Sequence, residues 1–484
     1  MISDNKKLIS LIMSMTVLSA VVSCSTTPQH NADSSVADSK EITDVPEEST
    51  TEVTEITTTE EVTTEATTEK PITKGNIYDV KGNLLMYTEG EKRKVNESYA
   101  VPLANIITEM SDGYDVRFNE ILSTPENELE EIGKSVQLTI DADVQNAVYN
   151  YMESANIIGS AVIMRTDGSI LSQVSYPSYD PSTVEKTEYD EELAWGACGN
   201  KAFQNFEPGS CFKIMSEVIS DKHGIYSQWD EGEWTDDGAT IVNWDHDTNG
   251  YYPMERSLSS AFINSSNIFF AKSFDRIGKD DVLKDLDEIF HYVTDIQCDF
   301  GDIQNNIEIT CNDDLRRSAF GQSYILTCPI YLSALGREAV FGDMVRPFVL
   351  KSVVDTDNPE TVLENGSQPN EVIATIPEEY RQNLLDGMLG VASGLGIYAG
   401  DNFTFYAKTG TAETWEGDFL YITGCLRNAN DTAGSSCDYL NYKQNGSYII
   451  VMQVRNPQYH GLGFASESSY LYQGIVNAVL ENQN

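Results

Sequence analysis

Runs of apolar residues that predict β-strands occur in two groups far apart in the 484-residue chain, and this arrangement constrains the fold most strongly. The segment GSAVIMRTDGSILSQVSYPS, residues 159–178, holds two runs joined by Asp167-Gly168, a pair typical of a tight hairpin turn. Three more runs, FTFYAKTG, FLYITGC and SYIIVMQV, fall within residues 403–455. We expect both groups to share one sheet, with helices between them and a final helix at 467–481 covering it. The predicted fold class is therefore α/β or α+β.

The beginning of the chain has the pattern of an export signal. Two lysines precede an apolar run from Leu8 to Val22, which at about 15 residues is shorter than the roughly 20 that a membrane span needs. The run ends in Val-Val-Ser-Cys, which resembles a bacterial lipobox, where Cys24 would be lipidated. We expect residues 1–24 to be a lipoprotein signal peptide, and an uncleaved signal anchor is the alternative. Either reading places the remaining chain outside the cytoplasm.

Residues 25–72 are rich in threonine and glutamate, as in STTEVTEITTTEEVTTEATTE. Such a segment has too few large apolar residues to fold, so we expect a disordered tether. The whole chain has a net charge of -45, which argues against nucleic acid and anionic lipid surfaces as partners. Residues 73–135, which open with a predicted hairpin in KGNIYDVKGNLLMY, are expected to form a small N-terminal module, and residues 136–484 the main domain.

The cysteines and histidines do not form an obvious metal site. Without Cys24, seven of the eight cysteines remain, and an odd number leaves at least one thiol unpaired within the chain. Two pairs near in sequence could form disulfides: Cys298 with Cys311, and Cys425 with Cys437. None of the five histidines stands at metal-ligand spacing from a second histidine or a cysteine. The Asp-His-Asp triplet at 245–247 is expected to be a polar loop, and we predict no metal and no cofactor.

Three short motifs carry the chemical interpretation. In FEPGSCFK, Ser210 follows a Pro-Gly break and Lys213 comes one helical turn later, so hydroxyl and amine share a helix face. A serine in this position is often only a helix cap. However, NSSNIFFAK then supplies Ser265 and Asn267, and FYAKTGTAE supplies Lys408-Thr409-Gly410. Ser-x-x-Lys, Ser-x-Asn and Lys-Thr-Gly in this order form the motif set of serine enzymes that react with penicillin.

From residue 74 onwards the chain resembles a class B penicillin-binding protein, a monofunctional peptidoglycan D,D-transpeptidase. The segments VQLTIDADVQ, SYPSYDPS, GNKAFQNFEPGSCFK, SSNIFFAK, GQSYILTCP and AKTGTAE resemble blocks of that family in family order. The resemblance implies the penicillin-binding transpeptidase fold, in which helices sandwich an antiparallel sheet next to a helical subdomain. Cys211, Cys328, the lipobox and the small N-terminal module depart from the family pattern.

The resemblance also implies a reaction that splits a D-Ala-D-Ala peptide through a serine ester. Ser210 is the implied nucleophile and Lys213 its base, because no histidine is near and because burial and the charge of Lys408 lower the pKa of Lys213. Ser265 would pass a proton to the leaving amine. Asn267 would hold the substrate amide and orient Lys213. Cys211 is a poorer nucleophile, since no histidine lies near it in sequence.

The third motif is implied to bind the substrate. Lys408, with the hydroxyls of Thr409 and Thr411, would bind the terminal carboxylate. Gly410 has no side chain and would let the strand backbone approach the substrate and pair with it. The backbone N–H groups of Ser210 and Thr411 would form the oxyanion hole.

The same motifs also serve other functions. A β-lactam sensor or wall-binding scaffold is acylated without turnover, a D,D-carboxypeptidase admits water, and a β-lactamase hydrolyses the drug. Glu308 and Asn312 loosely imitate a lactamase Glu-x-x-x-Asn pattern, but the long gap before the third motif favours a transpeptidase. Residues 73–135 are too few for a glycosyltransferase domain. Expected partners are peptidoglycan stem peptides, β-lactams and, through a lipid anchor, the extracytoplasmic face of the cell membrane.

Overall fold

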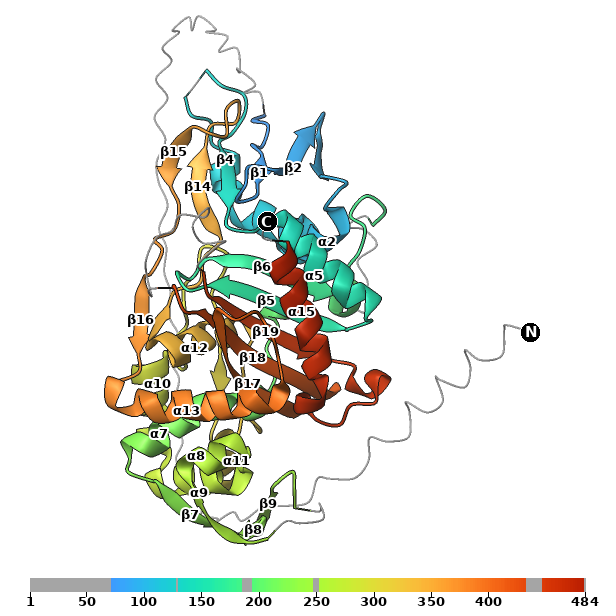
Figure 1. Cartoon of the computed structure of the whole chain (residues 1–484). Helices are drawn as coiled ribbons and strands as arrows, with labels where there is room; N and C mark the ends of the chain where they lie inside the picture. The colour runs from blue at the N-terminus through green and yellow to red at the C-terminus, as the bar shows by residue number, and fades with distance from the viewer. Residues whose placement is uncertain (1–70, 128, 185–193, 247–251, 432–445, 483–484) are drawn as a thin grey trace, which may run out of the picture. The chain divides into compact units, whose positions relative to one another are not determined.

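The computed structural model of the protein describes residues 71–127, 129–184, 194–246, 252–431 and 446–482 (Figure 1). The predicted signal peptide and nearly all of the predicted tether lie outside these ranges. Within them, none of the helices is long and apolar enough to cross a membrane.

A five-stranded antiparallel sheet is the centre of the fold, in the order β17-β18-β19-β5-β6. Its strands are β5 (Gly159–Arg165), β6 (Ile170–Tyr176), β17 (Phe403–Thr414), β18 (Gly417–Asn428) and β19 (Tyr448–Val454). Pairing of β19 with β5 joins the two groups of predicted strands, with Ile450 opposite Ile163. The hairpin predicted at Asp167-Gly168 is confirmed, and Gly168 has the positive φ of +94° that a turn of this kind favours.

Helices cover both faces of this sheet, which confirms the predicted sandwich. Side chains alternate along a strand, so neighbouring residues enter different cores. Ile163 and Ile450 pack with α5 (Ala142–Ser154) and α15 (Ser469–Glu481), which lie side by side in Figure 1. Val162 and Val451 pack on the opposite face, in the core that contains α12 (Pro329–Phe341). Burial on both faces explains why these strands read as continuous apolar runs.

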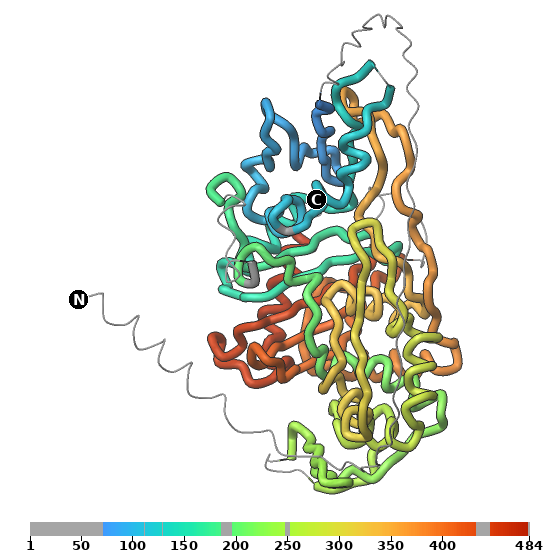
Figure 2. Tube along the Cα trace, turned by 180° about the vertical axis from the view of Figure 1, so that it is seen from behind, coloured from blue at the N-terminus to red at the C-terminus, as the bar shows by residue number. Residues whose placement is uncertain are grey.

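A helical subdomain lies between β6 and β17 in sequence, as the resemblance predicts (Figure 2). Its helices besides α12 are α7 (Lys213–Lys222), α8 (Leu258–Ile263), α9 (Asn267–Ile277), α10 (Lys279–Phe290), α11 (Asn312–Ser318) and α13 (Glu378–Leu395). Its short strand pairs are β7 (Ser227–Asp230) with β10 (Met254–Ser257), β8 (Glu233–Asp236) with β9 (Ala239–Val242), β11 (Asn306–Ile307) with β12 (Ile325–Leu326), and β13 (Asp343–Val345) with β16 (Val372–Thr375). Short helical turns at η3 (Ala194–Cys198), η4 (Lys201–Phe203) and η5 (Gly209–Phe212) complete this part, and η6 (Pro457–His460) and η7 (Ala465–Ser468) lie between β19 and α15.

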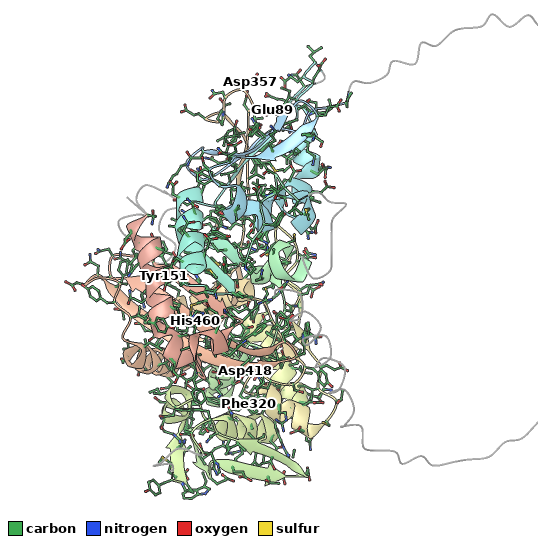
Figure 3. All side chains as sticks on the ribbon, turned by 90° about the vertical axis from the view of Figure 1, so that its right-hand side faces the viewer. Glu89, Tyr151, Phe320, Asp357, Asp418 and His460 are labelled. Carbon is green, nitrogen blue, oxygen red and sulfur yellow. The ribbon has the colours of Figure 1, made fainter. Side chains whose placement is uncertain are left out.

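A second, six-stranded sheet contains the predicted N-terminal hairpin. Its order is β15-β14-β4-β1-β2-β3, with β1 (Ile77–Tyr78), β2 (Leu84–Glu89), β3 (Lys92–Val95), β4 (Ser135–Leu138), β14 (Leu350–Val354) and β15 (Val362–Asn365). The helices α2 (Ala100–Ile107), α3 (Tyr114–Arg117) and α4 (Asn119–Leu122) and the turn η1 (Glu109–Ser111) lie between β3 and β4 in sequence. The residues predicted as a small module thus share a sheet with residues 350–365 (Glu89 and Asp357 mark its end in Figure 3).

The disulfide considered between Cys298 and Cys311 is wrong, because both are free thiols. The thiol of Cys311 points to Asp314 at the start of α11, with a distance of 3.4 Å between sulfur and Oδ2. Cys425 is also free and is buried in β18, and Cys437 lies outside the described residues.

Glu338 is a buried acid in the middle of α12. Its side chain is 0% exposed, and neither carboxylate oxygen has a hydrogen-bond partner among the described residues. Burial raises the pKa of Glu338 well above its usual value of 4.5. The folded state therefore keeps this proton at pH values where the unfolded chain releases it.

Replacing Glu338 by leucine should stabilise the protein most at high pH. Because the folded pKa is raised, the wild type loses stability as the pH rises above 4.5, and Glu338→Leu should remove that part of the slope. We expect a gain of about 1–3 kcal/mol at pH 8, the usual cost of an unsatisfied buried polar group. Thermal unfolding from pH 5 to 9 measures this, with the exposed Glu360→Gln as the control. Parallel pH curves for Glu338→Leu and wild type would contradict the prediction.

Candidate active site

Ser210 and Lys213 lie where η5 joins α7. Gly209, with φ +53°, lets this turn pack against β17, because a Cβ atom there would lie 2.4 Å from the carbonyl oxygen of Thr411. The α-helix itself begins at Lys213, three residues later than the sequence pattern predicts. Ser210 therefore does not cap a helix; its Oγ accepts a hydrogen bond of 2.9 Å from Lys213 Nζ.

Lys213 is fully buried and is surrounded by oxygen atoms. Besides Ser210 Oγ, its Nζ contacts the carbonyl oxygen of Ser265 at 2.7 Å, the hydroxyl of Ser265 at 3.1 Å and Oδ1 of Asn267 at 2.7 Å. The ring of Phe320, labelled in Figure 3, lies 5.9 Å from the amine. Burial, and next the positive charge of Lys408, lower the pKa of Lys213 well below its usual 10.5.

Ser265 stands between two amines. It lies in the turn from α8 to α9 with φ +56°, a left-handed conformation that is uncommon for a residue with a side chain. Its hydroxyl is 3.1 Å from Lys213 Nζ and 3.2 Å from Lys408 Nζ. The next residue, Ser266, caps α9 by accepting from the N–H of Phe269 at 3.0 Å.

β17 forms the third side of the site. Lys408 is fully buried, donates to the carbonyl oxygen of Thr409 at 2.9 Å, and has a pKa that burial lowers to about 8. Thr409 and Thr411 alternate with it and line the cavity next to Ser210, and the Thr411 hydroxyl accepts from the N–H of Ala465 at 3.1 Å. Gly410 faces the other way: a Cβ atom there would lie 2.5 Å from the carbonyl oxygen of Pro208. Its visible role is to let β17 pack against the turn that bears Ser210.

These side chains border a cavity of about 630 Å³. Ser210, Ser265, Asn267, Thr409 and Thr411 supply its polar centre. Trp244 and Phe464 form an apolar lip, with their rings edge to face and centroids 5.4 Å apart. A cavity of this size with a few convergent polar groups is typical of a small-molecule or peptide site.

The structure brings most of the residues predicted from the sequence together. Ser210, Lys213, Ser265, Asn267 and Lys408 are joined by direct contacts, and Thr409 and Thr411 lie beside them, whereas Cys24 lies outside the described residues. The cavity residues that were not predicted from the sequence include Asn243, Trp244, Arg317, Glu413 and Phe464, because single residues in loops, on a strand or on a helix carry no local signal.

Two side chains weighed as alternatives are not placed for catalysis. Cys211 is fully buried, its sulfur lies 3.5 Å from the carbonyl oxygen of Lys408, and burial raises its pKa, so it stays a thiol. Glu308 is exposed before α11 and is not among the residues that line the Ser210 cavity.

Comparison with known proteins gives a consistent picture. The family model described as the penicillin binding protein transpeptidase domain matches residues 159–480. Penicillin-binding protein 3 of Bacillus subtilis is 26% identical over 344 residues, which are 63% of this chain and 49% of that protein. A peptidoglycan D,D-transpeptidase FtsI homolog of Mesostigma viride is 24% identical over 260 residues, 48% of this chain and 41% of that protein. The chain thus spans about half the length of these curated relatives or less.

Solved structures show the same fold. The D,D-transpeptidase domain of a peptidoglycan glycosyltransferase from Eggerthella lenta superposes with a TM-score of 0.66 at 17% identity, over 86% of this chain and 99% of that one. Penicillin-binding protein A from M. tuberculosis, solved as an imipenem acyl-enzyme complex, gives 0.66 at 18% identity, over 85% and 99%.

Proposed function

Because the chain belongs to the penicillin binding protein transpeptidase domain family, we propose that it is a serine D,D-transpeptidase that cross-links peptidoglycan stem peptides and is acylated by β-lactams. The observation that carries this proposal is the contact of Ser210 Oγ with a buried lysine amine whose pKa is strongly lowered. A serine hydroxyl needs such a base to become a nucleophile at neutral pH.

The two buried lysines divide the chemical work. Burial lowers the pKa of Lys213 well below 10.5 and that of Lys408 to about 8, and Lys213 is the amine in contact with Ser210 Oγ, so we assign it the role of the base. Neutral Lys213 takes the proton of Ser210 as Oγ bonds to the carbonyl carbon of the penultimate D-Ala. Charged Lys408 remains as a source of positive potential for the terminal carboxylate, which the hydroxyls of Thr409 and Thr411 bind.

The remaining groups act on the proton and the oxyanion. The hydroxyl of Ser265, in reach of both amines, relays the proton to the nitrogen of the terminal D-Ala as the peptide bond breaks. The N–H groups of Ser210 and Thr411 stabilise the oxyanion, and each such donor is typically worth about 10²–10³ in rate. The amine of a second stem peptide then attacks the ester, restores Ser210 and completes the cross-link.

Labelling with a fluorescent penicillin tests the nucleophile. We expect the full-length protein to form a covalent adduct that survives denaturing electrophoresis, Ser210→Ala to form none, and the neighbouring control Cys211→Ala to keep it. A chase after drug removal separates the alternatives: a stable adduct fits a transpeptidase or a non-turnover sensor, and cross-linking of stem peptides by the same preparation distinguishes these two. Rapid loss of label with drug hydrolysis would replace the proposal by β-lactamase, and labelled Ser210→Ala would disprove the mechanism.

The acylation rate should depend on the protonation state of Lys213. Because only the neutral amine accepts a proton, the rate should fall as the pH drops through the lowered pKa of Lys213, which lies well below 10.5. An arginine at position 213 stays protonated from pH 5 to 9. The acylation rate of Lys213→Arg should therefore be lower by a factor of at least about 10², the scale of general-base catalysis. Stopped-time labelling from pH 5 to 9 measures both, with Lys222→Arg, nine residues further along α7, as control. A wild-type rate in Lys213→Arg would exclude Lys213 as the base.

We also propose that Cys24 anchors the protein to the outer face of the cell membrane through a lipid, with the acidic residues 25–72 as a tether to a catalytic domain at 136–484. The lipobox-like sequence and the composition of the tether support this reading. Cells fed labelled palmitate should label the wild-type protein and not Cys24→Ser, and the variant should move from the membrane to the soluble extracytoplasmic fraction. Equal labelling of both proteins would rule the anchor out.

A further inference from the structure

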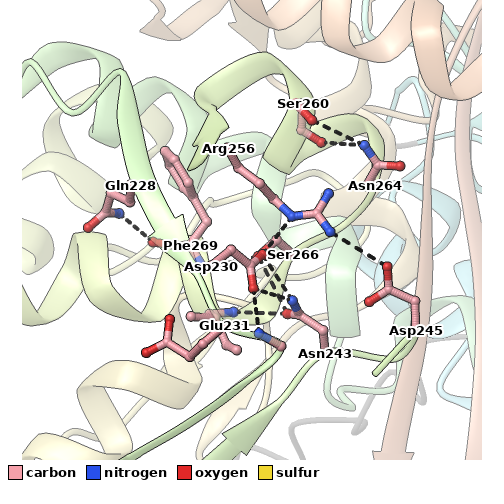
Figure 4. Close-up of polar contacts among 12 residues, drawn as sticks. Gln228, Asp230, Glu231, Asn243, Asp245, Arg256, Ser260, Asn264, Ser266 and Phe269 are labelled. Atoms are coloured by element: carbon pink, nitrogen blue, oxygen red, sulfur yellow. Dashed lines mark hydrogen bonds and ion pairs between the residues drawn. The ribbon is translucent and has the colours of Figure 1, made fainter. Parts of the chain in front are cut away.

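Part of the segment that connects α7 to α8, residues 223–257, reaches the turn that carries Ser265 and Asn267. We call residues 225–246 and 252–257 of this segment the arm; it contains the strand pairs β7 with β10 and β8 with β9. Figure 4 shows three side chains of the arm, Asp230, Asn243 and Arg256, meeting Ser266 at this turn.

Asp230 is the centre of this meeting point. It lies at the end of β7 and is 0% exposed. Its carboxylate pairs with Arg256 Nε at 2.7 Å and accepts from the hydroxyl of Ser266 at 2.6 Å and from Asn243 Nδ2 at 2.8 and 3.0 Å. The N–H of Gly232 donates to it at 3.0 Å. A buried carboxylate with this many donors holds each of them in place.

Asn243 links Asp230 to Asn267 by hydrogen bonds to both residues. Because its Nδ2 donates to Asp230, its Oδ1 faces the first turn of α9, where it accepts from the N–H of Asn267 at 2.7 Å and of Ile268 at 3.2 Å. The side chain of Asn267 is oriented too, since its Nδ2 donates to the carbonyl oxygen of Val242 at 3.0 Å. Only Oδ1 of Asn267 then remains to face Lys213 Nζ, at 2.7 Å.

The same contacts support the strained turn at Ser265. A positive φ at a serine persists only where the surroundings fix it. On the side of α9, Ser266 is fixed by Asp230 through its hydroxyl, and its N–H donates to the carbonyl oxygen of Ala261 at 2.8 Å. Ser265 is therefore held by a buried charge that is not part of any of the three sequence motifs.

We propose that Asp230 is a positioning residue for catalysis, which acts through Asn243 and Ser266 to fix Asn267 and Ser265 against Lys213. The proposal rests on the acylation of Ser210 proposed above. It predicts an effect on rate and on proton affinity together, because Asp230 acts on Lys213 both by position and by charge.

The charges that face Lys213 determine whether the loss of Asp230 raises or lowers the pKa of Lys213. They come from three elements: Lys408 on β17 lowers the pKa of Lys213 in the same direction as burial, which is the largest effect, whereas Asp230 on β7 and, less, Cys211 on η5 raise it. Removing the charge of Asp230 should therefore lower the pKa of Lys213 further. A residue that only stabilised the arm would not move the pH at which the acylation rate falls.

The experiment is the acylation rate of full-length protein with fluorescent penicillin, measured from pH 5 to 9 at a temperature well below unfolding. We expect Asp230→Asn to lower the acylation rate on the order of 10- to 100-fold, the scale of a displaced catalytic group. We also expect the acidic limb of the pH profile, the pH range in which the rate falls as Lys213 is protonated, to move to lower pH. Asn243→Ala removes the acceptor for both N–H groups without changing a charge, so it should lower the rate and leave the limb in place.

Asp285→Asn is the matched control. Asp285 is also buried, at 3% exposed, and pairs with Lys222 and His223 at the far end of α7. Its loss should lower the melting temperature and change neither rate nor pH profile. Wild-type rates in Asp230→Asn and Asn243→Ala would overturn the proposal, as would an unmoved acidic limb in Asp230→Asn. If Asp230→Asn does not fold, a wild-type rate in Asn243→Ala decides against it. An unlabelled wild type would instead disprove the proposed function itself.

Discussion

Two buried amines that share one hydroxyl are the arrangement on which the rest of the site depends. Lys213 Nζ and Lys408 Nζ approach Ser265 Oγ to 3.1 and 3.2 Å, and neither side chain is exposed. Two ammonium ions this close and this dry repel each other strongly, so the pair titrates in separate steps. Burial lowers the pKa of both lysines, and Lys213, the amine in contact with Ser210 Oγ, is the base of the proposed mechanism, with no histidine beside it. Burial is thus the source of the reactivity, and the fold must supply it.

The fold buries the two amines by packing three separate elements around them. Ser210 and Lys213 belong to η5 and α7, Ser265 to the turn between α8 and α9, and Lys408 to β17 of the central sheet. The first and third elements meet closely only because Gly209 and Gly410 carry no Cβ atom that would collide with the opposite backbone. These glycines therefore serve the packing of the helix against the sheet, which in turn keeps water away from the lysines.

The sequence revealed the parts of this structure that have a local pattern. Apolar runs with hairpin residues predicted β5, β6 and the later strands. Ser210, Lys213 and Lys408 were predicted because they belong to the short motifs Ser-x-x-Lys and Lys-Thr-Gly. The N-terminal hairpin also had a local pattern, but its place in a six-stranded sheet had none, because β4 pairs with β14 across more than two hundred residues. Asn243 was invisible for the same reason: one asparagine in a loop reads as a turn residue until its neighbour in space is known.

The arm shows why motif residues alone describe the site incompletely. Asn267 can present its oxygen to Lys213 only because Val242 occupies its Nδ2 group and Asn243 occupies its backbone N–H. Those contacts in turn depend on Asp230, whose buried charge Arg256 balances from a strand that precedes α8. A chain could keep all three motifs and lose this support through one substitution in the arm. If Asp230 positions the site as proposed, competence for acylation is a property of the arm and the motifs together.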